Sequence, residues 1–242
     1  MALQFTTAEE ASSLSGIKAL VYGGAGLGKT ALVATLPSPV LISAESGTLS
    51  LKKANLERIW GAGRADISYH IPTIVIQTME DLEDAYQWSS RSQEAQAFQS
   101  IALDSVSEMA EAVLNNAKRT VRDPRQAYGE LIEKMETKVR QFRDLQNRHV
   151  YFAAKQDTLK DELLGSTRYG PSMPGQQLGK HMPYFFDEVF CLRIGVNPQD
   201  QSNYRFLQTQ PDLQYEAKDR SGALAPVEPP HLGHVFSKIL GA

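Results

Sequence analysis

The sequence is short of the features that mark several classes of protein. It holds one cysteine, Cys191, so no disulfide can form within the chain, and we expect a reducing, cytoplasmic location. No apolar run reaches the roughly 18 residues of a membrane-spanning helix, and the first residues do not resemble a signal peptide, so we expect no membrane partner. The net charge of −3 is too small to indicate a polyanionic partner, so any contact with nucleic acid has to come from a local patch.

The composition is otherwise that of a globular domain. Hydrophobic residues make up 42% and charged residues 22% of 242 residues, which suffices for one domain with a large core. The first 15 residues are small and polar, and Gly16 ends them. We therefore predict a flexible lead-in over 1–15 and a single domain over 16–242.

One stretch fits the phosphate-binding loop pattern G-x-x-x-x-G-K-[ST] at every fixed position. In such a loop, glycines let backbone N–H groups close around phosphate oxygens, a lysine reaches the β- and γ-phosphates, and a hydroxyl binds Mg²⁺. Here Lys29 and Thr30 take the last two roles. The predicted nucleotide-binding residues are Gly23, Gly24, Ala25, Gly26, Leu27, Gly28, Lys29, Thr30 and Ala31.

The surrounding segments indicate an α/β fold. A short apolar strand over 17–22 precedes the loop and an apolar helix is expected from Thr30, the strand-loop-helix setting that the motif requires. Further apolar strands are expected over 40–44, 71–77, 100–104 and 149–154, with helices between them. Strands that are apolar on both faces suit a mostly parallel central sheet covered by helices on both sides. The segment 157–183 lacks periodicity and is expected to be a long loop, and a loop of this length in a compact domain is usually functional or disordered.

Two carboxylates follow predicted strands. Asp104 ends an apolar strand in the manner of a Walker B element, which supports the magnesium ion. Ser105 follows it, so the base that activates water has to come from elsewhere. Glu45 ends the strand after the phosphate-loop helix, where a carboxylate can orient water against the γ-phosphate. A solvated loop carboxylate is the alternative for Glu45, and a plain helix cap is the alternative for Asp104.

These motifs together resemble those of a known family. L-I-S-A-E at 41–45, A-L-D-S-V-S at 102–107 and a strand that ends at Gln156 resemble the RecA-type core. Y-G-E-L at 128–131 and A-K-D-R-S-G at 217–222 resemble more closely the small phage RecA-like P-loop ATPases, some of which are single-strand annealing recombinases of the Sak group. The resemblance implies a RecA-like P-loop NTPase core, ATP and Mg²⁺ as ligands, and the host cytoplasm as the location.

The resemblance also implies roles for further residues. Lys29 and Glu45 act in catalysis together with Gln156, which senses the γ-phosphate. Lys218 and Arg220 have the i, i+2 spacing of cations that reach the nucleotide site of a neighbouring subunit, so a homo-oligomer, ring or filament, is expected. A single-strand-binding protein is a further expected partner. A solvated charged turn is the alternative for Lys218 and Arg220.

The expected loop over 157–183 corresponds in place to the DNA-contacting loops of that family. Its candidate contacts to single-stranded DNA are Lys160, Arg168, Tyr169 and Lys180, although Asp157, Asp161 and Glu162 offset most of the charge. A basic cluster over 118–125 is a second candidate. Two other functions stay open: a nucleotide-switched module that loads replication or repair proteins, and a small-molecule P-loop kinase, for which an arginine-rich lid is lacking.

Overall fold

The computed structural model describes residues 7, 9–10, 16–45, 47–121, 123–160 and 167–241. Of the predicted lead-in, only Thr7, Glu9 and Glu10 fall among these residues, so its flexibility stays a prediction. None of the helices that the structure describes combines the length and the apolar character that a membrane span requires.

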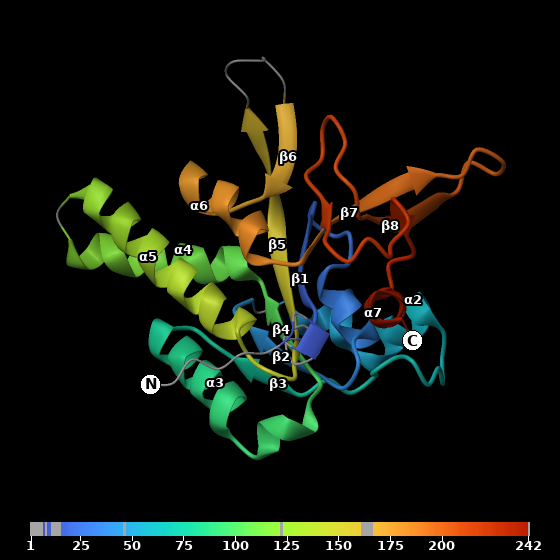
Figure 1. Ribbon diagram of the computed structural model, residues 1–242, viewed down its shortest axis with the longest axis horizontal. Helices are drawn as coiled ribbons and strands as arrows, with labels where there is room; N and C mark the ends of the chain where they lie inside the picture. Colours follow the sequence, from blue (N-terminus) through green and yellow to red (C-terminus); the bar gives the residue numbers. More distant parts are fainter. Residues whose placement is uncertain are drawn as a thin grey trace.

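A twisted sheet forms the centre of the molecule (Figure 1). In the described part of the chain it has ten strands, eight of them in the order β10-β8-β7-β1-β5-β4-β2-β3, while β6 pairs with β5 and β9 with β7. The pairs among β3, β2, β4, β5, β1 and β7 are parallel, and those of β8, β10, β6 and β9 are antiparallel. The strands are β1 Lys18–Gly23, β2 Pro39–Ser43, β3 Thr73–Val75, β4 Ser100–Asp104, β5 His149–Lys160, β6 Thr167–Pro171, β7 Glu188–Val196, β8 Asn203–Gln208, β9 Lys218–Asp219 and β10 Val227–Glu228.

Helices cover both faces of this sheet (Figure 1). The α-helices are α2 Lys53–Trp60, α3 Met79–Arg91, α4 Val106–Thr120, α5 Pro124–Arg143, α6 Gln176–His181 and α7 Leu232–Leu240. Short 3₁₀ helices are η1 Thr30–Thr35, η2 Thr48–Leu51, η3 Glu94–Ala97 and η4 Met182–Phe185. The predicted α/β fold class, a mostly parallel sheet flanked by helices, is confirmed.

The core divides into two layers because side chains alternate across each strand. Leu20, Leu103 and Phe152 point to the layer that α3, α4, α5 and α6 close. Their sequence neighbours Val21, Ala102 and Tyr151 point to the opposite layer, which η1 and α7 close. Burial on both faces explains why these strands are continuously apolar in the sequence.

Three predicted features are different in the structure. The segment 157–183 is not one long loop: β5 runs on to Lys160 and pairs with β6 as an antiparallel hairpin, and α6 follows. For the same reason the strand does not end at Gln156. The segment after the phosphate loop is the 3₁₀ helix η1, not an α-helix, and it closes within six residues. Backbone pairing with the adjacent strand β6 makes 157–160 part of a hairpin, and the last residue of η1, Thr35, accepts the backbone N–H of Leu232 in α7.

Candidate nucleotide-binding site

The phosphate loop follows β1 at the carboxyl edge of the sheet, where ligands of open α/β sheets bind. Gly26 and Gly28 have φ values of 74° and 104°, which side-chain-bearing residues rarely adopt. At Gly23 a Cβ atom would lie 2.7 Å from the carbonyl oxygen of Leu192 in β7. The glycines of the motif are therefore required by backbone conformation at two positions and by packing at a third.

Lys29 lies across the mouth of this loop. Its Nζ donates to the carbonyl oxygens of Gly23 and Gly24, at 2.8 and 3.0 Å. Burial lowers the pKa of Lys29, while the nearby Asp104 and Glu45 carboxylates oppose that shift. Its backbone carbonyl accepts a hydrogen bond from the hydroxyl of the buried Tyr151 at 2.8 Å, a contact that the sequence did not predict. Hydrogen bonds thus hold both the ammonium group and the backbone carbonyl of Lys29 in place.

Asp104 ends β4 beside the loop, and its carboxylate accepts a hydrogen bond from the Thr30 side chain. The residue is 3% exposed. Burial raises the pKa of Asp104 to about 6, the Thr30 hydrogen bond and Lys29 act against this shift, and Glu45 adds to it. A buried carboxylate next to a hydroxyl is the hard oxygen donor set that Mg²⁺ prefers.

Glu45 lies just after β2, which pairs directly with β4. Ser105 donates its hydroxyl to Oε1 of Glu45 at 2.6 Å, and the same hydroxyl accepts the N–H of Glu108 as the N-cap of α4. The Ser43 hydroxyl also donates to the Glu45 carbonyl oxygen at 2.8 Å. The sequence analysis gave Ser105 no role at the site, and the structure shows that its hydroxyl contacts the candidate base.

The residues present fit a magnesium nucleotide. The glycine loop, one ammonium, one hydroxyl and two carboxylates meet at one edge of the sheet, although they come from β1, η1, β2 and β4. Buried charge of both signs needs compensation, and a triphosphate with its cation supplies it for Lys29 and Asp104 together. The predicted association of Lys29, Thr30, Asp104 and Glu45 is observed.

Gln156 lies at the same edge, half-buried in β5, one residue beyond Lys155, which is in register with Gly23. The Lys155 ammonium forms ion pairs with Glu108 and Glu111 of α4. Among the described residues, the Gln156 side chain forms no hydrogen bond with the phosphate loop, so its sensor role stays a prediction.

Lys218 and Arg220 differ in their surroundings. The Lys218 ammonium donates to the carbonyl oxygens of Pro183 and Phe186, and burial lowers its pKa. The Arg220 side chain is 61% exposed and forms an ion pair with Asp187 at 2.8 Å. Arg220 is accessible to a neighbouring subunit, whereas Lys218 already has partners within its own chain. Their action across an interface stays a prediction.

The DNA-contact candidates lie around the β5–β6 hairpin, which extends beyond the sheet at the end where β5 leaves it (Figure 1). Arg168 and Lys180 are exposed, on β6 and α6. Tyr169 is half-buried and stacks on Tyr215, with ring centroids 4.9 Å apart, and Arg193 covers Tyr215 at 3.8 Å. The side chain of Lys160 lies outside the described residues.

A pocket of about 540 Å³ adjoins the phosphate loop. Its walls come from the loop and η1, the end of α2, and the β7–β8 hairpin. The sequence analysis did not predict it, because its lining residues are far apart in the chain and carry no motif.

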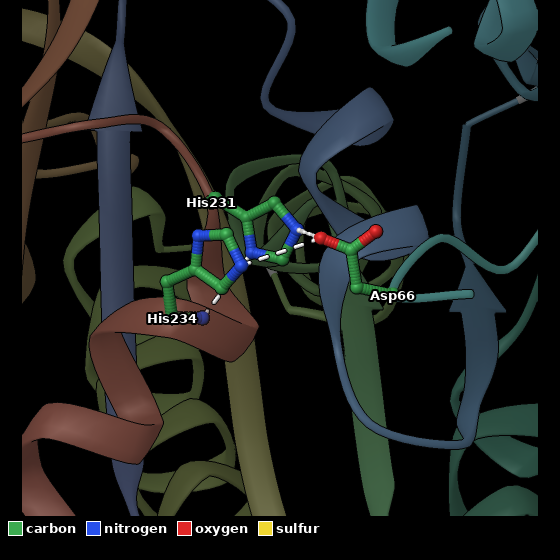
Figure 2. A group of neighbouring side chains, drawn as sticks. All are labelled: Asp66, His231 and His234. Carbon is green, nitrogen blue, oxygen red and sulfur yellow. Dashed lines mark hydrogen bonds and ion pairs between the residues drawn. The ribbon is translucent and has the colours of Figure 1, made fainter. Parts of the chain in front are cut away.

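A second polar cluster lies near this pocket. Figure 2 shows Asp66 facing His231 and His234, with its Oδ2 3.1 and 3.3 Å from their Nε2 atoms. Nδ1 of His231 accepts the backbone N–H of His234, so the proton of the neutral ring is on Nε2, which cannot then bind a metal. The two rings also stack, with centroids 3.7 Å apart and an interplanar angle of 12°. The cluster, in this arrangement, joins the start of α7 to the segment that holds Arg64 and Asp66.

The chain was compared with known proteins. No curated protein matches it. A KaiC-like protein from the hyperthermophilic archaeon Pyrococcus horikoshii has a similar structure at 13% identity and a TM-score of 0.43, over 80% of this chain and 77% of that one. Residues 15–221 match the family AAA_24, described as an AAA domain. The match extends over most of the chain and includes the phosphate loop, Glu45 and Asp104, and this P-loop protein therefore belongs to the AAA_24 family of AAA domains.

Proposed function

We propose that this chain binds ATP with Mg²⁺ and hydrolyses it as a homo-oligomer that binds single-stranded DNA in phage recombination. One observation carries the proposal: Lys29, Asp104 and Glu45 interact at one edge of the sheet, directly at the phosphate loop. A loop that only joined a strand to a helix would need neither of the two carboxylates.

Each residue has a distinct task in this proposal. Lys29 and the loop N–H groups hold the β- and γ-phosphates, and Thr30 and Asp104 hold the cation. Bound magnesium neutralises the charge of the phosphates. Glu45 accepts a proton from the attacking water, and Ser105 keeps one of its oxygens in place.

The contact with DNA rests on the β5–β6 hairpin and α6. The exposed cations Arg168 and Lys180 can bind DNA phosphates there. The Glu216 carboxylate lies near enough to interact with the charge of Arg168. Gln156 joins the two functions, because it lies in β5 between the residue in register with the phosphate loop and the start of the hairpin. Single-strand annealing is the activity that we propose for this assembly.

The test is phosphate release, measured with and without single-stranded oligonucleotide over a range of protein concentrations. We expect turnover to rise with DNA and with protein concentration, and to fall at least about 100-fold in Lys29→Ala and in Glu45→Gln. Glu45→Gln should retain ATP binding, because the amide keeps the shape of the side chain. Failure of the wild-type protein to bind any single-stranded oligonucleotide at low salt, with or without ATP, would refute the DNA part.

A further inference from the structure

The pocket beside the phosphate loop has a defined position relative to the two carboxylates. In the sheet, β4, which ends at Asp104, and β2, which precedes Glu45, lie on one side of β1, whereas β7 and β8, which line the pocket, lie on the other. A triphosphate on the loop with its terminal phosphate toward Asp104 therefore has its other end toward β7 and β8. That end carries the nucleoside.

The walls of the pocket suit a base and a ribose. Leu27, Trp60 and Ile194 supply apolar surface, while Asn203 and Arg205 supply polar groups at its edge. Its volume of about 540 Å³ falls in the usual range of small-molecule sites. Ile194 and Tyr204 are 49% and 48% exposed, which is high for large side chains that line a concave site.

Two polar groups of the lining residues lack partners. The indole Nε1 of Trp60 is buried and has no hydrogen-bond partner. Among the described residues, Arg205 has no hydrogen-bond or ion-pair partner either, and its Nη1 lies 3.9 Å from where a Cβ on Gly28 would be. The Arg205 side chain is exposed, so its guanidinium is accessible to the acceptor atoms of a ligand that extends from the phosphate loop, whereas the buried Trp60 Nε1 is not, and Trp60 offers such a ligand only its apolar ring.

The back of the pocket is held in place. The Trp60 ring packs edge-on against His231, with centroids 6.0 Å apart, and His231 contacts Asp66 and His234 in the cluster of Figure 2. The adjacent Pro230 also lines the pocket. The histidine–aspartate cluster thus fixes the wall against which a base would pack.

We propose that this pocket binds the nucleoside of the nucleotide whose phosphates occupy the phosphate loop, with Trp60 against the base and Arg205 over the ribose and the first phosphate. This inference rests on the proposed nucleotide binding and adds the residues that recognise the nucleoside. It assigns a binding role to the β7–β8 hairpin, to which the sequence analysis gave none.

The experiment separates the nucleoside from the phosphates. The chain has two tryptophans, so Trp88→Phe leaves Trp60 as the only one. This variant is titrated with Mg-ATP and with Mg-tripolyphosphate, which carries the phosphates alone, while Trp60 emission is recorded and affinities are measured by calorimetry. We expect ATP to bind at least about tenfold more tightly than tripolyphosphate, and only ATP to change the emission.

Substitutions identify the contact. Arg205→Ala should weaken ATP binding about tenfold and tripolyphosphate binding less. Arg91→Ala, an exposed arginine at the end of α3, is the matched control and should change neither. Equal affinities for ATP and tripolyphosphate, with unchanged Trp60 emission, would overturn the inference and leave the phosphate site intact. Absence of binding by both ligands in a folded protein would overturn the proposed nucleotide binding itself, and the inference with it.

Discussion

Asp104 combines deep burial with a position next to the loop hydroxyl, and its protonation decides whether it can support a cation. Its pKa of about 6 is the result of burial, which exceeds the opposing effects of Thr30 and Lys29. At the residue scale, the protonation of Asp104 therefore depends on the charges of Lys29 and Glu45 beside it.

Magnesium-dependent ATP binding should therefore weaken in acid. Above about pH 6 Asp104 is a carboxylate and supports the cation; below it the group is protonated, so the magnesium-dependent part of the affinity should fall by up to about tenfold per pH unit. Calorimetric titrations across this range, with and without Mg²⁺, measure the effect. Asp104→Asn should remove the contribution of Asp104 and leave the pH dependence of the ATP γ-phosphate, which itself titrates at about pH 6, so a dependence as steep as that of the wild-type protein in this variant would exclude Asp104 as its source.

Ser105 should affect turnover more than binding. Ser105→Ala removes the hydrogen bond to Glu45 Oε1, so the candidate base loses its orientation, and we expect kcat to fall about tenfold with unchanged ATP affinity. The hydroxyl is also the N-cap of α4, whose loss costs about 1 kcal/mol of stability.

Thr78→Ala is the matched control for Ser105→Ala. It removes an N-cap hydroxyl from α3, where Thr78 accepts the N–H of Asp81, and it should cost a similar stability without changing kcat. Thermal unfolding and steady-state kinetics on both variants separate the two effects. Equal kcat in both variants would show that Ser105 is only a cap.

Among the elements, the β5–β6 hairpin differs most from the structure that the sequence predicts. The segment 157–183, which has no periodicity in the sequence, contains the end of β5 paired antiparallel with β6, followed by α6. Candidate DNA contacts thus lie on regular elements, not on a loop, and their positions relative to the sheet are fixed by β5 itself. Contacts on rigid elements hold a strand at a constant place relative to the nucleotide.

Arg168→Ala should weaken single-stranded DNA binding without regard to sequence. If Arg168 contacts a phosphate, the slope of log affinity against log salt should decrease by about 0.7. Fluorescence anisotropy with a labelled oligonucleotide at several salt concentrations measures this slope. Arg91→Ala removes the same charge from α3, at the opposite end of the molecule (Figure 1), and should leave the slope unchanged. An unchanged slope in Arg168→Ala would exclude this phosphate contact.

At the scale of the whole molecule, the two cations of the predicted interface are not equivalent. Lys218 holds the carbonyl oxygens of Pro183 and Phe186 within its own chain, so Lys218→Ala should reduce stability. Arg220 is exposed, and its ion-pair partner among the described residues is the surface carboxylate of Asp187, so the fold should tolerate its loss. Arg220 is therefore the better candidate for action on a neighbouring subunit.

Mixing two inactive variants tests this action. Lys29→Ala lacks the phosphate-loop lysine but keeps Arg220, and Arg220→Ala has the reverse, so a mixture should contain competent interfaces at about a quarter of the positions in a random ring. Phosphate release from the mixture should exceed that of either variant alone several-fold. The control is a mixture of Lys29→Ala with the double variant that carries both Lys29→Ala and Arg220→Ala, in which every subunit lacks the phosphate-loop lysine. No recovery in a mixture shown to co-assemble would exclude a contribution across the interface.

The sequence by itself determined the phosphate loop, the α/β class and the two carboxylates. Those signals are local: glycine spacing, apolar strands buried on both faces, and an acid at a strand end. The parallel arrangement then brings Glu45 and Asp104 to one edge, because β2 and β4 are neighbours.

Only the tertiary structure decided the β5–β6 pairing, the 3₁₀ form of η1 and the pocket beside the loop. The backbone N–H of Leu232 donates to Thr35 of η1 across 197 positions in the chain, and the pocket joins residues from four separate segments. The pocket depends on contacts between distant segments and the hairpin on the pairing of two consecutive strands, and the residue pattern of a single segment encodes neither.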